Sequence, residues 1–485
     1  MDFKNPNMLV AGSNLINYYT SIDRGYSWYK DTLHSSMGVW GDPVTVADTN
    51  GSFYYFHMGG YREDRIVCQK LINMTSHIWT DGSFAGQADT PKVEDKPWAA
   101  VDRKNNEIYL TWSRYDKLSF RDSTDSTNIF FSKSVDTGHS WSPAIRKNKV
   151  EGDCSNQSKS VEGAMPCAGP NSEIYVAWAH EDAILFIRSF DGGSSWLSNE
   201  VLVSNSPGGW YYNNVPGIFR TTGLPFIASD NSNGLYRGTV YINWADERNG
   251  VNNSDIWIVK STDSGGTWSA PIRVNDDAGS REQFMSSMTV DPVTGYVYVL
   301  FYDRRNYLDS FSTDVYLAVS KDGAASFQNF LISDRPFTLQ SSVFFGDYTG
   351  IVAYNNIVRP TWGAQNKVNA MYFDAKIMTA IIDSTITGNY VAQLNRSAYN
   401  LQVYPNPFAG NTSIAYDLPS PENISLFITD IVGRKVVVIR DNELTGPDRH
   451  VEQFDAAKYG LASGIYFLCL KGNGDSQTVK MVVGR

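Results

Sequence analysis

The chain has few of the residues on which many protein functions depend. Its 485 residues include only four cysteines and six histidines. Cys68, Cys154, Cys167 and Cys469 have no metal-binding or redox spacing. No apolar run approaches the roughly 18 residues that span a membrane, and long helical periodicity is absent. Positive charge is also in deficit: the net charge of −10 argues against nucleic acid or anionic membrane as a partner.

Common catalytic and targeting signatures are missing as well. There is no Gly-x-Ser-x-Gly elbow, no His-Glu-x-x-His and no phosphate-binding glycine loop. The first six residues form neither a charged n-region nor an apolar h-region. Either the chain is cytosolic or an export leader is absent from this version, and we favour the second interpretation. Cys154 and Cys167 flank one loop and could form a disulfide in an oxidising compartment, or remain buried thiols.

The most informative feature that is present is an eight-residue motif, Ser-x-Asp-x-Gly-x-x-Trp, which occurs four times, with a weaker fifth copy over 320–327 that has alanine at the glycine position and ends in Phe. The carboxylate can accept hydrogen bonds from the backbone of a tight turn, and the glycine permits positive φ. The terminal aromatic can pack the hairpin onto a neighbouring sheet. We therefore expect structural turns held by buried carboxylates. Their aspartates are Asp23, Asp136, Asp191, Asp263 and Asp322.

A second repeating element alternates β-branched and aromatic residues and often ends in Trp. Its copies lie at 8–11, 53–56, 108–112, 174–178, 240–244, 297–301 and 358–362. The intervals of 45 to 66 residues suit blades of four short strands. The chain is predicted to be all-β, with a seven-bladed β-propeller over 1–385. Six blades remain open if the N-terminal strands complete the final unit. A linker over 386–400 and a small Ig-like β-sandwich over 401–485 follow.

Both repeating patterns resemble known families. The eight-residue turns resemble the Asp-boxes (bacterial neuraminidase, or BNR, repeats) of sialidase-like propellers, where such boxes lie at the blade periphery. The segments 404–408, 430–436 and 464–467 resemble the motifs of the type A C-terminal sorting domain of the type IX secretion system. That resemblance implies Sec export, passage across the outer membrane and removal of the domain at the cell surface. An Ig-like carbohydrate-binding module is the competing interpretation.

Propeller topology predicts where chemistry lies. Loops that enter the first strand and leave the second strand of each blade should open opposite the Asp-boxes. Polar residues gather there, including Lys96 and Arg220. The catalytic candidates are Asp42, Asp95, Glu162, Glu247, Arg248, Asp303, Arg304, Arg305 and Asp347. Arginines can grip a carboxylate, and two carboxyl groups can act as acid and base or nucleophile. Alternatively, these charges pair with one another.

The match to sialidases is incomplete. Their Phe/Tyr-Arg-Ile-Pro motif is absent, and 219–225 is only a loose echo. Arg248 with Arg304 or Arg305 could supply two members of the sialidase arginine triad. Because the third is unassigned, sialidase activity does not follow from the fold. The resemblance also implies a tyrosine nucleophile, and the candidates are Tyr302, Tyr307 and Tyr348.

These features favour a secreted or cell-surface, sialidase-like protein that acts on or binds glycans. One hypothesis is an exo-acting glycoside hydrolase (exo-alpha-sialidase-like) of acidic sugars. The alternative is a non-catalytic propeller that binds glycan or protein, and a cytosolic scaffold is a third. Expected partners are a glycan or glycoprotein and the type IX machinery, without nucleic acid or a transmembrane segment. No cofactor is required, although Ca²⁺ could bind at Asp276-Asp277 or within 122–125.

Overall fold

The computed structural model divides the chain into two compact units, Met1–Thr387 and Gly388–Arg485. It describes residues 1–60, 64–87, 91–117, 125–154, 157–212, 215–307, 311–367, 373–383, 399, 401–418, 421–431, 433–446, 448–472 and 476–484. The predicted linker 386–400 lies almost wholly outside these residues, so its borders stay a prediction. No helix in the described ranges is long and apolar enough to cross a membrane.

The first unit consists of successive antiparallel sheets. The first sheet contains β1 (Leu9–Ser13), β2 (Asn17–Ser21) and β3 (Tyr29–Thr32). The second contains β4 (Gly41–Ala47), β5 (Phe53–Gly59), β6 (Arg65–Asn73), β7 (Ile78–Trp79) and β8 (Ser83–Ala85). The third contains β9 (Val93–Val101), β10 (Ile108–Tyr115), β11 (Ser126–Ser134), β12 (Ile145–Arg146) and β13 (Gly152–Asp153). A short 3₁₀ turn over Gln157–Lys159 follows them.

The next four sheets continue the same order of strands. They are β14 (Val161–Ala168), β15 (Ile174–His180), β16 (Ala183–Ser189) and β17 (Val201–Asn205); β20 (Phe226–Ser229), β21 (Val240–Asp246), β22 (Asp255–Ser261) and β23 (Ile272–Arg273); β24 (Gln283–Val290), β25 (Val297–Asp303), β26 (Ser312–Ser320), β27 (Gln328–Leu331) and β28 (Phe337–Thr338); and β29 (Gly350–Tyr354), β30 (Ile357–Lys367) and β31 (Phe373–Thr379). A two-stranded ribbon, β18 (Tyr211–Tyr212) and β19 (Thr221–Thr222), lies between β17 and β20.

The Tyr-centred segments form the strands that were predicted from them. Those segments are parts of β1, β5, β10, β15, β21, β25 and β30. In β5, β10, β15, β21 and β25 nearly every residue is buried, which indicates strands covered on both faces, and Trp112, Trp178 and Trp244 are fully buried. Such strands lose the alternation of a half-exposed sheet.

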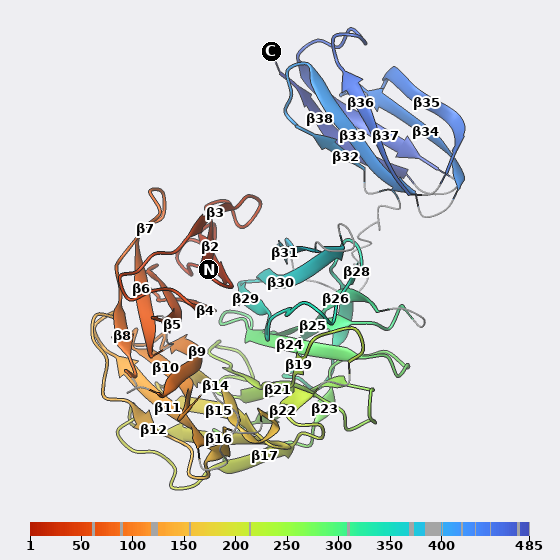
Figure 1. The fold of residues 1–485 in the computed structure, drawn as a ribbon. Helices are drawn as coiled ribbons and strands as arrows, with labels where there is room; N and C mark the ends of the chain where they lie inside the picture. Colours follow the sequence, from red (N-terminus) through yellow and green to blue (C-terminus); the bar gives the residue numbers. More distant parts are fainter. Residues whose placement is uncertain are drawn as a thin grey trace. The chain divides into compact units, whose positions relative to one another are not determined.

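The sheets follow one another around a common centre (Figure 1). The Asp-box tryptophans Trp141, Trp196 and Trp268 each pack on an aromatic ring of the preceding sheet; the Trp196 ring, for example, lies 4.9 Å from that of Phe131. Trp28 of the first sheet packs in the same way beside Ile357 of the last. The first and last sheets thus meet through side chains. The predicted all-β class, with successive antiparallel sheets arranged as in a propeller, is confirmed, whereas the number of blades stays a prediction.

The five Asp-box turns share one hydrogen-bond pattern. In the first, Asp23 Oδ1 accepts from the Ser21 hydroxyl at 2.8 Å and from the Ser27 N–H at 2.9 Å. Hydrogen bonds from the Ser27 side chain and backbone lower the pKa of Asp23 to about 2. The aspartates have structural partners, as predicted. The expectation that they are buried was wrong, because the turns lie at the surface: three of the five aspartates are exposed and the other two are partly exposed.

The C-terminal unit is a two-sheet β-sandwich, as predicted. One sheet contains β32 (Gln402–Tyr404), β33 (Asn411–Leu418) and β36 (Asp448–Asp455); the other contains β35 (Lys435–Thr445), β34 (Glu422–Thr429), β37 (Gly464–Lys471) and β38 (Ser476–Val483). Apolar residues of both sheets, such as Ile414 and Leu468, form one buried core.

Of the two alternatives for Cys154 and Cys167, the structure has the buried thiols and not the disulfide, because both cysteines are free and buried. The Cys154 thiol packs with Val93 and Tyr115 and contacts the Ser126 carbonyl at 2.9 Å. Cys167 lies on β14 and belongs to a separate hydrophobic cluster, which includes Tyr175 and Phe186. Nearness in the sequence did not bring the two side chains together, since they pack into different cores.

Candidate functional site

Four inner strands carry the same β-bulge near their beginning. In β4, β9, β14 and β24, two residues face one residue of the second strand. The first bulged residue has positive φ in each strand. These residues are Asp42 (φ 49°), Lys96 (47°), Gly163 (65°) and Met285 (49°). A bulge re-aims a side chain at the end of a strand, so the repeated bulge delivers Asp42 and Lys96 to one place.

The charged group at this place is centred on a buried lysine. Lys96 Nζ lies 3.5 Å from Asp95 Oδ2 and 3.4 Å from Asp347 Oδ2. The Arg220 guanidinium binds the same Asp347 carboxylate with two nitrogens, with Nε at 2.7 Å from Oδ1. The Lys96 and Asp347 side chains are only 6% and 4% exposed. We call Asp42, Asp95, Lys96, Glu162, Arg220, Asp347 and Tyr348 the hub cluster.

The carboxyl groups of the hub cluster differ in protonation. Burial raises the pKa of Asp42 to about 7 and that of Glu162 to about 8, although Lys96 opposes both shifts. For Asp347, burial acts in the same direction, but Lys96 and Arg220 outweigh it and lower the pKa. Near neutral pH, Asp347 is therefore ionised and Glu162 is largely protonated. Environments that separate the pKa values of neighbouring carboxyls are typical of acid–base sites.

Aromatic side chains form one wall of the hub cluster. The Trp98 ring lies 5.0 Å from that of Tyr348 and 5.1 Å from that of Phe226. The Tyr348 hydroxyl is buried and has no hydrogen-bond partner among the described residues. Burial raises its pKa, and Asp42 is the charge that raises it most. Tyr348 is therefore the tyrosine candidate that belongs to the hub cluster.

The other two tyrosine candidates are engaged elsewhere. The Tyr302 hydroxyl lies 3.1 Å from both the N–H and the carbonyl of Gly363. The Tyr307 hydroxyl donates to Asp314 Oδ2 at 3.1 Å. Their positions thus connect loops and strands of the propeller.

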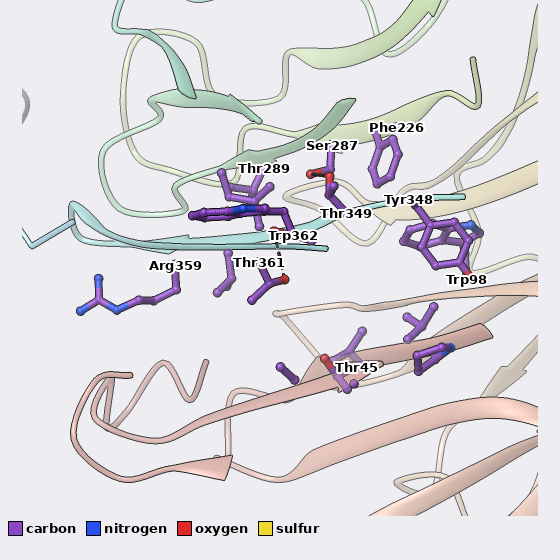
Figure 2. Close-up of a pocket in the computed structure, with 18 of the residues that line it drawn as sticks. Thr45, Trp98, Phe226, Ser287, Thr289, Tyr348, Thr349, Arg359, Thr361 and Trp362 are labelled. Carbon is purple, nitrogen blue, oxygen red and sulfur yellow. Dashed lines mark hydrogen bonds between the residues drawn. The ribbon is translucent and has the colours of Figure 1, made fainter. Parts of the chain in front are cut away.

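A cavity of about 700 Å³ adjoins the hub cluster. Its lining includes residues of β1, β4, β9, β14, β20, β24 and β29, together with Asp347 and Tyr348, and Asp42 is one of the residues of β4. Figure 2 shows hydroxyl-bearing residues such as Ser287 and Thr349 projecting between these strands, where the Thr349 hydroxyl donates to that of Ser287 at 2.8 Å. The lining thus combines polar groups with the rings of Trp98, Phe226 and Trp362 (Figure 2).

Four of the nine catalytic candidates, Asp42, Asp95, Glu162 and Asp347, belong to the hub cluster. The remaining five do not. Arg248 binds Asp246, with Nε at 2.9 Å from Oδ1. Glu247 accepts from the Asn252 N–H at 3.1 Å.

The two neighbouring arginines also have partners of their own. Arg305 Nε donates to Asp303 Oδ2 at 2.7 Å. Arg304 is fully buried, donates to the Pro216 carbonyl at 2.7 Å, and lies 3.7 Å from Glu282. The suggestion that Arg248 with Arg304 or Arg305 supplies two members of an arginine triad gains no support, because each arginine binds a different partner.

Sequence reasoning missed the aromatic wall, Trp98 and Phe226. One signal was available: proline follows Asp42 and Lys96, and the dipeptide Leu224-Pro225 precedes Phe226. A repeated X-Pro at the start of an inner strand marks an irregular strand entrance.

The expected Ca²⁺ positions gain no support. Asp276 forms an ion pair with Arg305 at 2.5 Å, and residues 122–124 lie outside the described residues. Within the described ranges, no group of three or more His, Cys, Asp or Glu residues has a metal-binding arrangement. Calcium binding remains an untested expectation.

Comparisons with known proteins identify the C-terminal unit. Residues 402–484 match the family model described as "Secretion system C-terminal sorting domain". The predicted sorting domain is thereby confirmed, and it indicates a secreted or outer-surface protein. A search of the curated proteins gave no match.

The propeller has similar solved structures, at low identity. The Hadza microbial sialidase Hz136 is 14% identical, covering 74% of this chain and 72% of its own, with a TM-score of 0.43. The NanB sialidase of Streptococcus pneumoniae is 11% identical over 71% and 68%, with a TM-score of 0.44. A PL25 ulvan lyase is 10% identical over 79% and 92%, with a TM-score of 0.42. At these values, any assignment of activity rests on the residues of this chain.

Proposed function

We propose that the hub cluster is a glycan-binding site and that the protein is a secreted or cell-surface glycoside hydrolase. One observation carries the proposal: neighbouring carboxyl groups that border a cavity differ in protonation near neutral pH. A glycosidase needs one carboxylic acid that protonates the leaving oxygen and one ionised carboxylate. The polar lining and the Trp98 wall suit a sugar, which presents both hydroxyl groups and an apolar face.

Asp42 is the proposed acid. It is partly exposed and borders the cavity, and its pKa of about 7 leaves a proton available at neutral pH. Asp347, which borders the same cavity and whose pKa is lowered by Lys96 and Arg220, is the proposed ionised carboxylate. Glu162 is fully buried and therefore acts behind the site, where its proton limits the negative charge around Lys96.

The arrangement favours a neutral sugar over an acidic one. Arg220 is committed to Asp347 by two hydrogen bonds, and Lys96 lies between two aspartates. A sugar carboxylate would have to compete with these internal partners for each cation. Buried pairs of this kind are costly to break. Sialic acid is therefore a poorer candidate than a neutral hexose or N-acetylhexosamine.

A non-catalytic glycan-binding role is the second candidate. The observation that favours it is the internal pairing of Lys96, Arg220, Asp95 and Asp347, which describes a rigid recognition surface equally well. Turnover separates the two functions.

The test uses the full chain with a panel of 4-methylumbelliferyl glycosides, including a sialoside, and with neutral polysaccharides. We expect hydrolysis of a neutral glycoside that Asp42→Asn reduces by at least about 100-fold. The matched control is Asp136→Asn, which removes a carboxylate from a peripheral turn. Binding without turnover would support the second candidate, and neither binding nor turnover would refute both.

A further inference from the structure

Two half-exposed phenylalanines stand beside the hub cluster. Phe219 directly precedes Arg220, and Phe344 lies three residues before Asp347. Their side chains are 53% and 48% exposed. The two rings lie 6.1 Å apart at 79°. They form one edge-to-face pair rather than two isolated residues, and exposed aromatic groups beside a polar site typically mark a binding surface.

The pair is held in place by the charged groups of the site. The Arg220 guanidinium lies 4.7 Å from the centre of the Phe344 ring, and the same guanidinium is fixed by Asp347. A cation over a ring restricts the orientation of that ring. The platform is therefore pre-organised, which lowers the entropy cost of binding a ligand on it.

The loop that carries Phe219 has its own anchor. Arg304 donates to the carbonyl of Pro216 at 2.7 Å, and its guanidinium lies 5.6 Å from the Phe311 ring. A Cβ on Gly217 would lie 2.6 Å from that ring, so the loop packs closely there. Arg304 thus acts as a positioning residue for the aromatic pair.

We infer that Phe219 and Phe344 form a stacking subsite for a second sugar ring, so that the protein takes an oligosaccharide chain instead of a single terminal sugar. The inference rests on the proposed function and extends it from a sugar class to a chain length. The inference depends on the position of the pair next to the hub cluster. Phe219 is the sequence neighbour of Arg220, and Arg220 binds Asp347 and contacts the Phe344 ring. The apolar face of a pyranose ring fits an exposed aromatic ring, whereas a charged ligand would gain little there.

The test measures binding to an array of neutral oligosaccharides with one to six sugar units, using the full chain. The variants are Phe219→Ala and Phe344→Ala. Phe190→Ala is the matched control, because Phe190 is also exposed (59%) and also lies under an arginine, with Arg188 at 4.7 Å. Phe190 belongs to a peripheral Asp-box turn instead of the hub. Thermal melting of each variant checks folding.

We expect both hub variants to weaken binding of chains of two or more units by about tenfold, with monosaccharide binding and the Phe190→Ala control unchanged. Equal binding by Phe344→Ala and Phe190→Ala would overturn the inference while leaving the proposed function intact. If Asp42→Asn leaves hydrolysis unchanged but the phenylalanine variants weaken oligosaccharide binding, the proposed hydrolase function fails and the aromatic subsite stands. Absence of any glycan binding by the unmodified chain would overturn both.

Discussion

Replacement of Lys96 by methionine tests the electrostatic account of the hub cluster. Lys96→Met keeps most of the buried aliphatic stem but removes the ammonium group. At an effective dielectric of about 20, each carboxylate contact near 3.5 Å is worth roughly 5 kcal/mol before desolvation is subtracted. Removal of one partner of a buried ion pair costs about 3–5 kcal/mol net. We expect a loss of that size at pH 8.

The loss should depend on pH in a defined direction. The pKa values of Asp42 and Glu162 are raised in the folded protein, so these groups favour folding at low pH and disfavour it as pH rises through about 7 to 8. Without Lys96, more protons bind to the folded state. The penalty should therefore shrink markedly between pH 8 and pH 5.

Urea unfolding of the full chain, followed by tryptophan fluorescence at pH 8 and pH 5, measures both effects. Lys104→Met is the control, because Lys104 is exposed and its replacement should cost less than about 0.5 kcal/mol. A Lys96→Met penalty below about 1 kcal/mol that is equal at both pH values would refute the reasoning, because the carboxyls would then not depend on the buried ammonium.

Three further predictions follow from particular contacts. Glycosidase activity should fall as pH rises through about 7, the pKa of Asp42, because the acid loses its proton; a pH–rate profile without that limb excludes Asp42. Gly265→Ala should destabilise the propeller by about 3 kcal/mol, because φ at Gly265 is +83° and a Cβ would lie 2.3 Å from the buried Phe186 ring. Thermal melting measures the effect. The control is Ala324→Gly at the equivalent Asp-box position, where φ is 58°, and it should change stability by less than about 1 kcal/mol. Reductant should leave the melting temperature unchanged, because Cys154 and Cys167 are free; a drop would show a disulfide.

The sequence predicted the blade strands because their signal is local and repeated. A strand buried on both faces needs a continuous apolar run, and 108–112 and 174–178 show one without reference to the rest of the fold. Four residues of the hub cluster could be predicted for the same reason, since each lies just before or at the beginning of an inner strand: Asp42, Asp95, Glu162 and Asp347. The β-bulge that positions Asp42 and Lys96 was not predictable, because one extra residue breaks the two-residue period from which register is inferred.

The arginines were misplaced for a different physical reason. Arg248 and Arg305 each lie two residues after an aspartate that ends a second strand, and each folds back onto that aspartate. The local pair forms at small entropy cost, so it outcompetes a distant ligand site. The Asp-x-Arg spacing was visible in the sequence and favoured the local pair over a convergent triad.

The central claim is that the hub cluster binds a glycan, and a crystal structure of the chain with a bound neutral oligosaccharide tests it most directly. The account predicts one sugar ring between Asp42 and Tyr348, and the next ring on the Phe219–Phe344 pair. An oligosaccharide bound at the Asp-box turns or on the sorting domain, with the hub cluster unchanged and unbound, would contradict it.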